Sequence, residues 1–257
     1  MKKVLMFIAS SSPVQFIVNI VIYAFYAAVL GASLAPSIAV IVWGVHQFLL
    51  NLPADYLYLG LQILYFALSC GVAFYLYMMW GSFFMGLLIR ILSIGMKPGT
   101  YPAVSLTTLR WIIYSGIFTI VVRTILPITV MSFFCKLFFR LLGCKIGKNV
   151  YINSPSLNDA KFLEIGDDSV IGGGADITCH TFEGGRLTLG RIKIGKSSVI
   201  GARAYIFPNV TIGDRCSIGV DTIIRKNRVI PDKSMVGIPA GIPLKAVAKF
   251  EKEQWGE

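Results

Sequence analysis

Four side chains that can take part in proton transfer lie close together in one short segment of the chain. His180 is one of only two histidines in the protein, and Asp176, Cys179 and Glu183 lie within four residues of it. An imidazole suits general base catalysis, because its unperturbed pKa of about 6.5 lies near the usual working pH. His180 is therefore the first candidate for a base that takes a proton from an attacking hydroxyl or amine.

The neighbours of His180 allow several interpretations. Glu183 is a candidate carboxylate for orienting the imidazole, as in catalytic pairs, but it can equally be a solvated loop charge. Asp176 is a second candidate for the same role. Cys179 beside a histidine suggests a thiol nucleophile. Adjacent residues on an extended segment point in opposite directions, however, which favours a structural role for Cys179.

The residues after Gly143 follow a period of six. Isoleucine or valine occupies every sixth position from Ile194 to Ile242, and earlier members of the series are Ile146, Ile152, Ile165, Ile171 and Ile177. Neither a helix, with a period of 3.6, nor a single strand, with a period of two, explains this spacing. A β-helix built from hexapeptide repeats does. Glycine commonly follows the apolar residue, which suits a turn with a positive φ or a close approach of two backbones.

Within the later repeats the series is interrupted once, between positions 177 and 194, which are 17 residues apart where whole hexads would give 12 or 18. The inserted loop covers residues 178–186 and contains His180. An insertion in a stacked solenoid projects from the coil, so we expect this loop to reach a neighbouring part of the protein or a neighbouring subunit.

The coils resemble those of the hexapeptide-repeat, or isoleucine-patch, acyltransferases. The resemblance covers residues 143–245 and is carried by the stretch 194–214 and by the turn Val236-Gly-Ile-Pro-Ala240. It implies a left-handed parallel β-helix, a homotrimer, and an acyl-CoA donor, with acetyl-CoA expected, in a groove between subunits. The family's catalytic histidine lies in a loop that corresponds to the one with His180. The resemblance thus predicts His180 as the general base of a direct transfer. Glu183, three residues on, stays beside it as a candidate catalytic residue from its position in the loop.

The same resemblance indicates which residues bind the coenzyme. Small residues would let its pantetheine arm lie close to the coil, and basic side chains in a turn can pair with its phosphates. The expected coenzyme-binding residues are Gly201, Ala202, Gly219, Arg225, Lys226, Pro239 and Ala240. Every coil also needs turn glycines, so a purely structural role is the alternative for each glycine. Val220 stands where the family commonly has alanine, which leaves the acyl chain open.

The first half of the chain has a different composition. The whole protein is 55% hydrophobic and only 14% charged, whereas a soluble domain has about 25% charged residues. Residues 1–150 contain one acidic residue, Asp55, and ten basic ones. Positive charge beside apolar segments indicates cytoplasmic anchoring of a membrane protein rather than nucleic-acid binding. A weaker resemblance, carried by Leu109-Arg-Trp111 and residues 139–152, is to the membrane-bound C-terminal domain of polylysine-type peptide synthetases.

These observations predict three parts. Residues 1–142 are expected to form a transmembrane helical domain with four or six passes and both ends in the cytoplasm. Residues 14–32 and 37–52 would each cross once. Residues 57–95 are long enough to cross either once or twice, and a second crossing would need a reversal near Gly81. Residues 143–242 are expected to form the β-helix, and residues 243–257 a short capping helix.

Two functional hypotheses follow. The first is an integral protein of the cell inner membrane whose cytoplasmic β-helix acylates a membrane lipid or lipid-linked acceptor. The alternative is a membrane-anchored β-helix scaffold without catalysis. A metal is not expected, because two histidines cannot make a three-histidine site and the five cysteines form no CxxC pair. Arg110 and Arg123, in an apolar stretch, are candidates for binding an anionic lipid head group or phosphate.

Overall fold

The structure, a computed structural model, describes residues 12–49 and 56–237. Contacts within the chain divide it into two compact units. The first unit contains Met1–Ile91 and Gly116–Val121, and the second contains Leu92–Ser115 and Val122–Glu257. Each unit is described separately below.

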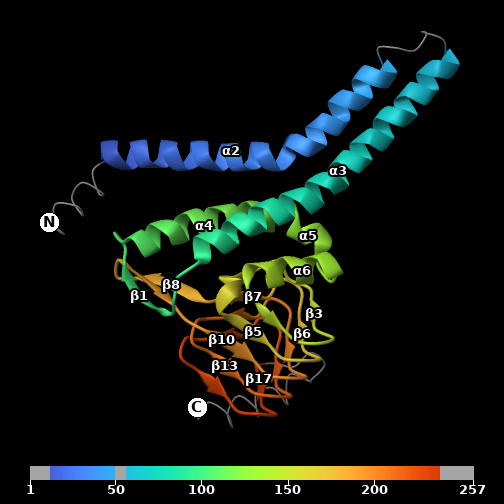
Figure 1. The fold of residues 1–257 in the computed structure, drawn as a ribbon. Coiled ribbons are helices and arrows are strands. Elements are labelled where there is room, and N and C mark those ends of the chain that lie inside the picture. Colours follow the sequence, from blue (N-terminus) through green and yellow to red (C-terminus); the bar gives the residue numbers. More distant parts are fainter. Residues whose placement is uncertain (1–11, 50–55, 238–257) are drawn as a thin grey trace. The chain divides into compact units, whose positions relative to one another are not determined.

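The first unit is built from long apolar helices. Helix α2 (Ser12–Gly44) is followed by a π-helical turn, η1 (Val45–Leu49), and helix α3 (Tyr56–Ser93) begins after it (Figure 1). Large apolar side chains such as Phe16 and Tyr75 face outward, with exposed fractions of 66% and 68%. Outward-facing apolar side chains on a helix whose backbone bonds are satisfied internally suit a lipid environment.

Three described helices are long and apolar enough to cross a membrane, namely Phe16–Gln47, Leu59–Ser93 and Leu106–Thr124. The predicted reversal near Gly81 is wrong, because α3 continues through it without a break. A glycine inside a helix costs only about 1 kcal/mol, which a long apolar segment tolerates. The predicted break before residue 37 is also absent, since α2 includes Pro36. The number of passes stays a prediction.

The second unit contains both ends of α4 (Leu106–Thr124), whose residues 116–121 belong to the first unit, and all of α5 (Leu126–Thr129) and α6 (Phe133–Leu142). Helix α6 has a clear start and end. The Ser132 hydroxyl accepts a hydrogen bond from the backbone N–H of Cys135, and Gly143 terminates the helix in the left-handed conformation with a φ of 101°. The chain therefore leaves the helix at Gly143, the residue after which the six-residue period begins.

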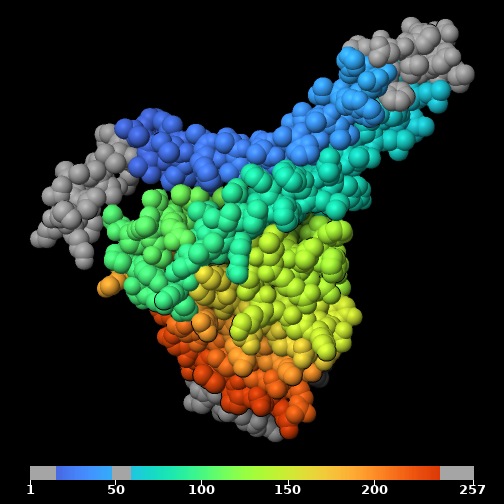
Figure 2. All heavy atoms as spheres, in the orientation of Figure 1, coloured from blue at the N-terminus to red at the C-terminus, as the bar shows by residue number. Residues whose placement is uncertain are grey.

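The rest of the second unit is a parallel β-helix. It has three parallel sheets, of five, five and four strands. Consecutive strands along the chain belong to different sheets, and within each sheet the strands of successive coils lie side by side. Figure 2 shows the coils following one another in sequence order, from yellow through orange to red. The strands of the first sheet are β2 (Lys145–Ile146), β5 (Leu163–Ile165), β10 (Ile192–Ile194), β13 (Thr211–Ile212) and β16 (Val229–Ile230). The second has β3 (Tyr151–Ile152), β6 (Val170–Ile171), β11 (Val199–Ile200), β14 (Ser217–Ile218) and β17 (Met235–Val236). The third has β4 (Leu157–Asn158), β7 (Asp176–Thr178), β12 (Tyr205–Ile206) and β15 (Ile223–Ile224).

The six-residue period sets the register of these sheets. Ile165 pairs with Ile194 and Ile194 with Ile212, so one isoleucine of each strand stacks on that of the next coil. Ile171 pairs with Ile200 in the same way, and both are fully buried. The prediction of a parallel β-helix from the hexapeptide repeat is thereby confirmed. Its last predicted member, Ile242, lies outside the described residues.

The glycines after the isoleucines are explained by close approach of backbones. A Cβ at Gly172 would lie 2.6 Å from the Ala202 nitrogen and 2.7 Å from the Gly201 carbonyl carbon in the next coil. Positive φ angles fall instead on a later turn position, as at Ser197, Arg203 and Asn209, and Gly174 is the glycine found there. Of the two reasons offered for the repeat glycines, close backbone approach is thus the one that applies at Gly172.

Candidate active site

The inserted loop forms a β-hairpin. Strands β8 (His180–Glu183) and β9 (Arg186–Leu189) pair in antiparallel fashion, and Gly184 and Gly185 make the turn with φ angles of 54° and 70°. A third strand, β1 (Gly99–Pro102), pairs with the other edge of β9. His180 therefore begins a three-stranded sheet whose outer strand comes from a segment far upstream in the chain.

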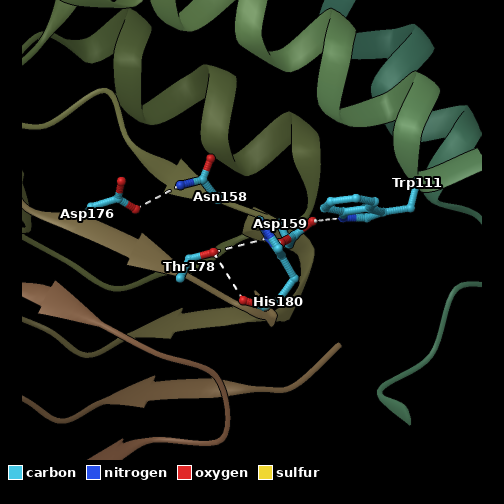
Figure 3. A network of polar contacts seen from close by, with 6 residues as sticks. All are labelled: Trp111, Asn158, Asp159, Asp176, Thr178 and His180. Atoms are coloured by element: carbon cyan, nitrogen blue, oxygen red, sulfur yellow. Dashed lines mark hydrogen bonds and ion pairs between the residues drawn. The ribbon is translucent and has the colours of Figure 1, made fainter. Parts of the chain in front are cut away.

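The imidazole of His180 is held by a buried carboxylate. Its Nδ1 lies 2.5 Å from Oδ2 of Asp159, and the Thr178 hydroxyl lies 3.1 Å from the same nitrogen (Figure 3). The side chain of Asp159 is 4% exposed, whereas that of His180 is 25% exposed. The pair thus has one end in the protein interior and the other within reach of solvent.

Asp159 owes its position to an irregular turn in the first coil. It follows β4 in the left-handed conformation, with a φ of 56°, and precedes a single 3-10 turn, η2 (Ala160–Phe162). Aspartate tolerates this conformation better than most residues. Its carboxylate does not cap η2 but accepts a hydrogen bond from the indole N–H of Trp111, 2.9 Å from Oδ1. Both carboxylate oxygens are therefore engaged.

This arrangement defines which imidazole nitrogen is available. A carboxylate at Nδ1 favours the tautomer in which Nδ1–H donates to Asp159 and the lone pair is on Nε2. When Nε2 takes a proton, the neighbouring negative charge stabilises the imidazolium that forms. The site can therefore act as a general base at Nε2.

Two other residues near His180 have different surroundings. Oδ1 of Asp176 accepts a hydrogen bond of 2.9 Å from the Asn158 amide. Burial raises the pKa of Asp176, while this hydrogen bond and the charge of His180 act in the opposite direction. Burial also raises the pKa of the Cys179 thiol well above its usual range, and nearby Asp159 adds to the shift. A fully buried, protonated thiol agrees with a structural role for Cys179 rather than with a nucleophile.

The structure brings together two predicted site residues that had been assigned to different roles. Glu183, the predicted partner of His180, forms an ion pair with Lys226, a predicted coenzyme-binding residue, with 2.5 Å between Nζ and Oε2. The position beside Nδ1 of His180 is occupied by Asp159 instead. Asp159 was missed because it lies 21 residues upstream, outside the loop. The signal for it was a solitary acidic residue at an irregular point of the hexad series.

The other predicted coenzyme-binding residues lie on the coils. Gly201 and Ala202 follow β11, and a Cβ at Gly201 would lie 2.5 Å from the carbonyl carbon of Gly219 in the next coil. This close approach of the two coils explains the absence of a side chain at Gly201, and it brings Gly219 against the same point, without any ligand. Arg225 lines a hollow of about 530 Å³ at the last described coil, together with Arg228. Pro239 and Ala240 lie outside the described residues.

We expect Glu183→Gln to change the rate of any reaction at this site by less than tenfold. The Glu183–Lys226 pair is exposed, with 61% and 48% of the side chains accessible, and exposed pairs contribute only about 0.2–1 kcal/mol. The rate with saturating donor would be measured for Glu183→Gln and Lys226→Met. A loss as large as that from replacing His180 would show that Glu183 belongs to the catalytic machinery after all.

Metal-binding groups are absent from the part of the chain that the structure describes. No group of three or more histidine, cysteine, aspartate or glutamate side chains within residues 12–49 and 56–237 is arranged to hold a metal ion.

Comparison with known proteins gives relatives in sequence, although no family model matches the chain. The chain is 27% identical over 170 residues to a delta-poly-L-ornithine synthetase of Acinetobacter baumannii. The aligned region is 65% of this chain and 12% of that protein. It is 29% identical over 121 residues to a putative acetyltransferase of Bacillus subtilis, covering 46% of this chain and 67% of that protein. The chain thus spans only about an eighth of the first relative.

Among solved structures, a hexapeptide-repeat containing acetyltransferase from Vibrio cholerae is similar with a TM-score of 0.34 and 17% identity, over 41% of this chain and 74% of that one. The β-helix described above rests on this chain's own strand pairing and not on that similarity. The two relatives in sequence, a poly-L-ornithine synthetase and a putative acetyltransferase, agree with the resemblance to hexapeptide-repeat acyltransferases that the repeat predicts.

Proposed function

We propose that the protein transfers an acyl group from acyl-CoA, with acetyl-CoA the expected donor, to a hydroxyl or amine of a membrane-associated or lipid-linked acceptor. The observation that carries this proposal is the His180–Asp159 pair on a hairpin that projects from a hexapeptide coil. A carboxylate buried against an imidazole carries a desolvation penalty that a solvated pair does not. This cost speaks against the alternative of a scaffold without catalysis.

The proposed reaction is a direct transfer. Nε2 of His180 takes the proton of the acceptor while the acceptor oxygen or nitrogen attacks the thioester carbonyl. The tetrahedral intermediate then breaks its carbon–sulfur bond, and the imidazolium returns the proton to the departing thiolate of coenzyme A. Asp159 keeps Nδ1 protonated and stabilises the positive charge between the two steps.

The donor would lie along the coil edge in a groove between subunits of a left-handed, homotrimeric β-helix. Turn residues with little or no side chain would contact its pantetheine arm, and the basic side chains would pair with its phosphates. The residues proposed for this role are Gly201, Ala202, Gly219, Arg225, Lys226, Pro239 and Ala240. Because Lys226 forms an ion pair with Glu183, binding of a phosphate there would have to compete with that carboxylate.

The acceptor side of the proposal follows from the helical part. Three helices that are apolar enough to cross a membrane support a location in the cell inner membrane, with the β-helix in the cytoplasm. An enzyme anchored in this way meets its acceptor at the membrane surface. A lipid or lipid-linked molecule is therefore the proposed class of acceptor.

The proposal is tested by thioester consumption. Purified protein in detergent would be given acetyl-CoA and a membrane lipid extract, and release of the coenzyme thiol would be followed for the wild type and His180→Ala. We expect the variant to lose about 10²–10⁴-fold in rate while it still binds coenzyme A, because only the proton acceptor has been removed. Equal rates for both proteins, or no coenzyme binding by either, would support the scaffold instead.

A further inference from the structure

Trp111 contacts both members of the proposed catalytic pair. Its indole N–H donates a hydrogen bond of 2.9 Å to Oδ1 of Asp159. Its ring lies edge-on to the imidazole of His180, with 4.7 Å between centroids and 62° between planes. Trp111, on α4, therefore holds Oδ1 of Asp159 by a hydrogen bond. It also packs against the imidazole of His180, which contacts Oδ2 of the same carboxylate (Figure 3).

The orientation of Asp159 depends on this hydrogen bond. The carboxylate is nearly inaccessible to water, and it is bound by Trp111 at Oδ1 and by His180 at Oδ2. An indole has a donor and no acceptor, so it can only hold a carboxylate or carbonyl oxygen in this place. Removing the donor would leave a buried charged oxygen unpaired, and the carboxylate would turn or move to recover a partner.

Residues close to Trp111 and to Asp159 in the sequence bind the same short stretch of backbone. Arg110, the neighbour of Trp111, donates hydrogen bonds of 2.6 and 2.5 Å to the carbonyls of Leu92 and Ile94. Lys161, on the 3-10 turn after Asp159, donates to the carbonyls of Ser93 and Met96. Cations at the carbonyl end of a helix are favourable, because that end carries a partial negative charge.

The segment 92–96 therefore anchors the helix that carries the donor and the turn that carries the acceptor. Arg110 was predicted as a candidate for an anionic head group or phosphate. Its guanidinium is engaged with two backbone carbonyls in the structure, which gives it a role in holding Trp111 in place.

We propose that Trp111 is a positioning residue for acyl transfer, which sets the direction of Asp159 and through it the tautomer and ring orientation of His180. This inference rests on the proposed function and adds a requirement to it: the catalytic pair is complete only with a side chain from α4, outside the hexapeptide coils. Trp111 acts through its hydrogen bond to Asp159 and through its ring contact with the imidazole of His180.

The kinetic test uses Trp111→Phe, which keeps an aromatic ring and removes the N–H donor. We expect kcat to fall about 10- to 100-fold, as for other partners that orient a functional histidine, with KM for acyl-CoA unchanged and the pH–rate profile displaced. In the Asp159→Asn background the same substitution should cause no further loss, because residues that act as one unit are not additive. Leu109→Ala, at an exposed position of the same helix, is the control and should keep the wild-type rate.

A second measurement does not depend on turnover. Protonated histidine quenches the emission of an indole that it contacts, so wild-type fluorescence should show a pH-dependent step that is absent from both Trp111→Phe and His180→Gln. A wild-type kcat and pH profile for Trp111→Phe, with His180→Ala inactive, would overturn the positioning role and leave the proposed function intact. If no form of the protein turns over, the proposed function fails, and absence of the fluorescence step would overturn the contact itself.

Discussion

Asp159→Asn is expected to lower the rate of acyl transfer by about 10⁴-fold, although it changes only one atom. The Trp111 N–H needs an oxygen, so the amide of the new side chain should turn its carbonyl toward Trp111 and its NH₂ toward His180. An NH₂ group facing Nδ1 requires a lone pair on Nδ1 and moves the proton to Nε2. The nitrogen that should accept a proton from the acceptor would then already carry one.

The measurement is the steady-state rate with saturating acetyl-CoA, together with coenzyme binding and the thermal midpoint of unfolding. Asp221→Asn is the matched control, because Asp221 is an exposed coil carboxylate that forms an ion pair with Arg203, 2.6 Å away. Its replacement should leave the rate within about twofold, as for most surface substitutions. If Asp159→Asn retains wild-type activity while it folds and binds coenzyme normally, the buried carboxylate does not set the tautomer of His180.

Gly172→Ala is expected to be the most damaging of the small substitutions in the coils. Its Cβ would lie within 2.7 Å of three backbone atoms, those of Ala202, Gly201 and Ile200, and backbone in a stacked coil cannot turn aside as a side chain can. Overpacking of a close-packed interior costs about 1–3 kcal/mol, and the upper end applies here because several contacts are affected. We expect a lower unfolding midpoint or a protein that does not assemble its coils.

The neighbouring glycine provides the control. A Cβ at Gly173 would meet the amide of Asn153 at 3.3 Å, and this side chain can shift by the few tenths of an ångström required. Gly173→Ala should therefore keep nearly the wild-type midpoint, measured for both variants in the same detergent by circular dichroism of the β-structure. Equal destabilisation by the two substitutions would mean that glycine is needed at position 172 for a reason other than coil spacing.

The fold could be predicted where the sequence pattern is itself the structural rule. A period of six admits few structures, and it located both the coils and the loop with His180. The helical part was harder, because composition shows that a segment is apolar but not where one helix ends. Gly81 and Pro36 were taken as breaks, and the long helices include both.

The site was predicted in part for a similar reason. His180 could be found because the insertion displaces it from the repeat. Asp159 and Trp111 reach it from other elements, and their meeting depends on tertiary structure that no local pattern records. Strand β1 was missed as well, since Gly99 and Pro102 are poor strand formers and the strand exists only because β9 offers an edge.

The pairing of β1 with β9 has a consequence for how this protein can be divided and made. Gly99 pairs with Leu189, so the sheet that begins at His180 closes only after the ribosome has released the first coils. A fragment that started at the first hexad would contain His180 and Asp159 but would lack β1 and Trp111. It would expose the edge of β9 to pairing with other chains. The part of the gene that encodes the hexapeptide repeat is therefore shorter than the part that encodes all the residues of the candidate site.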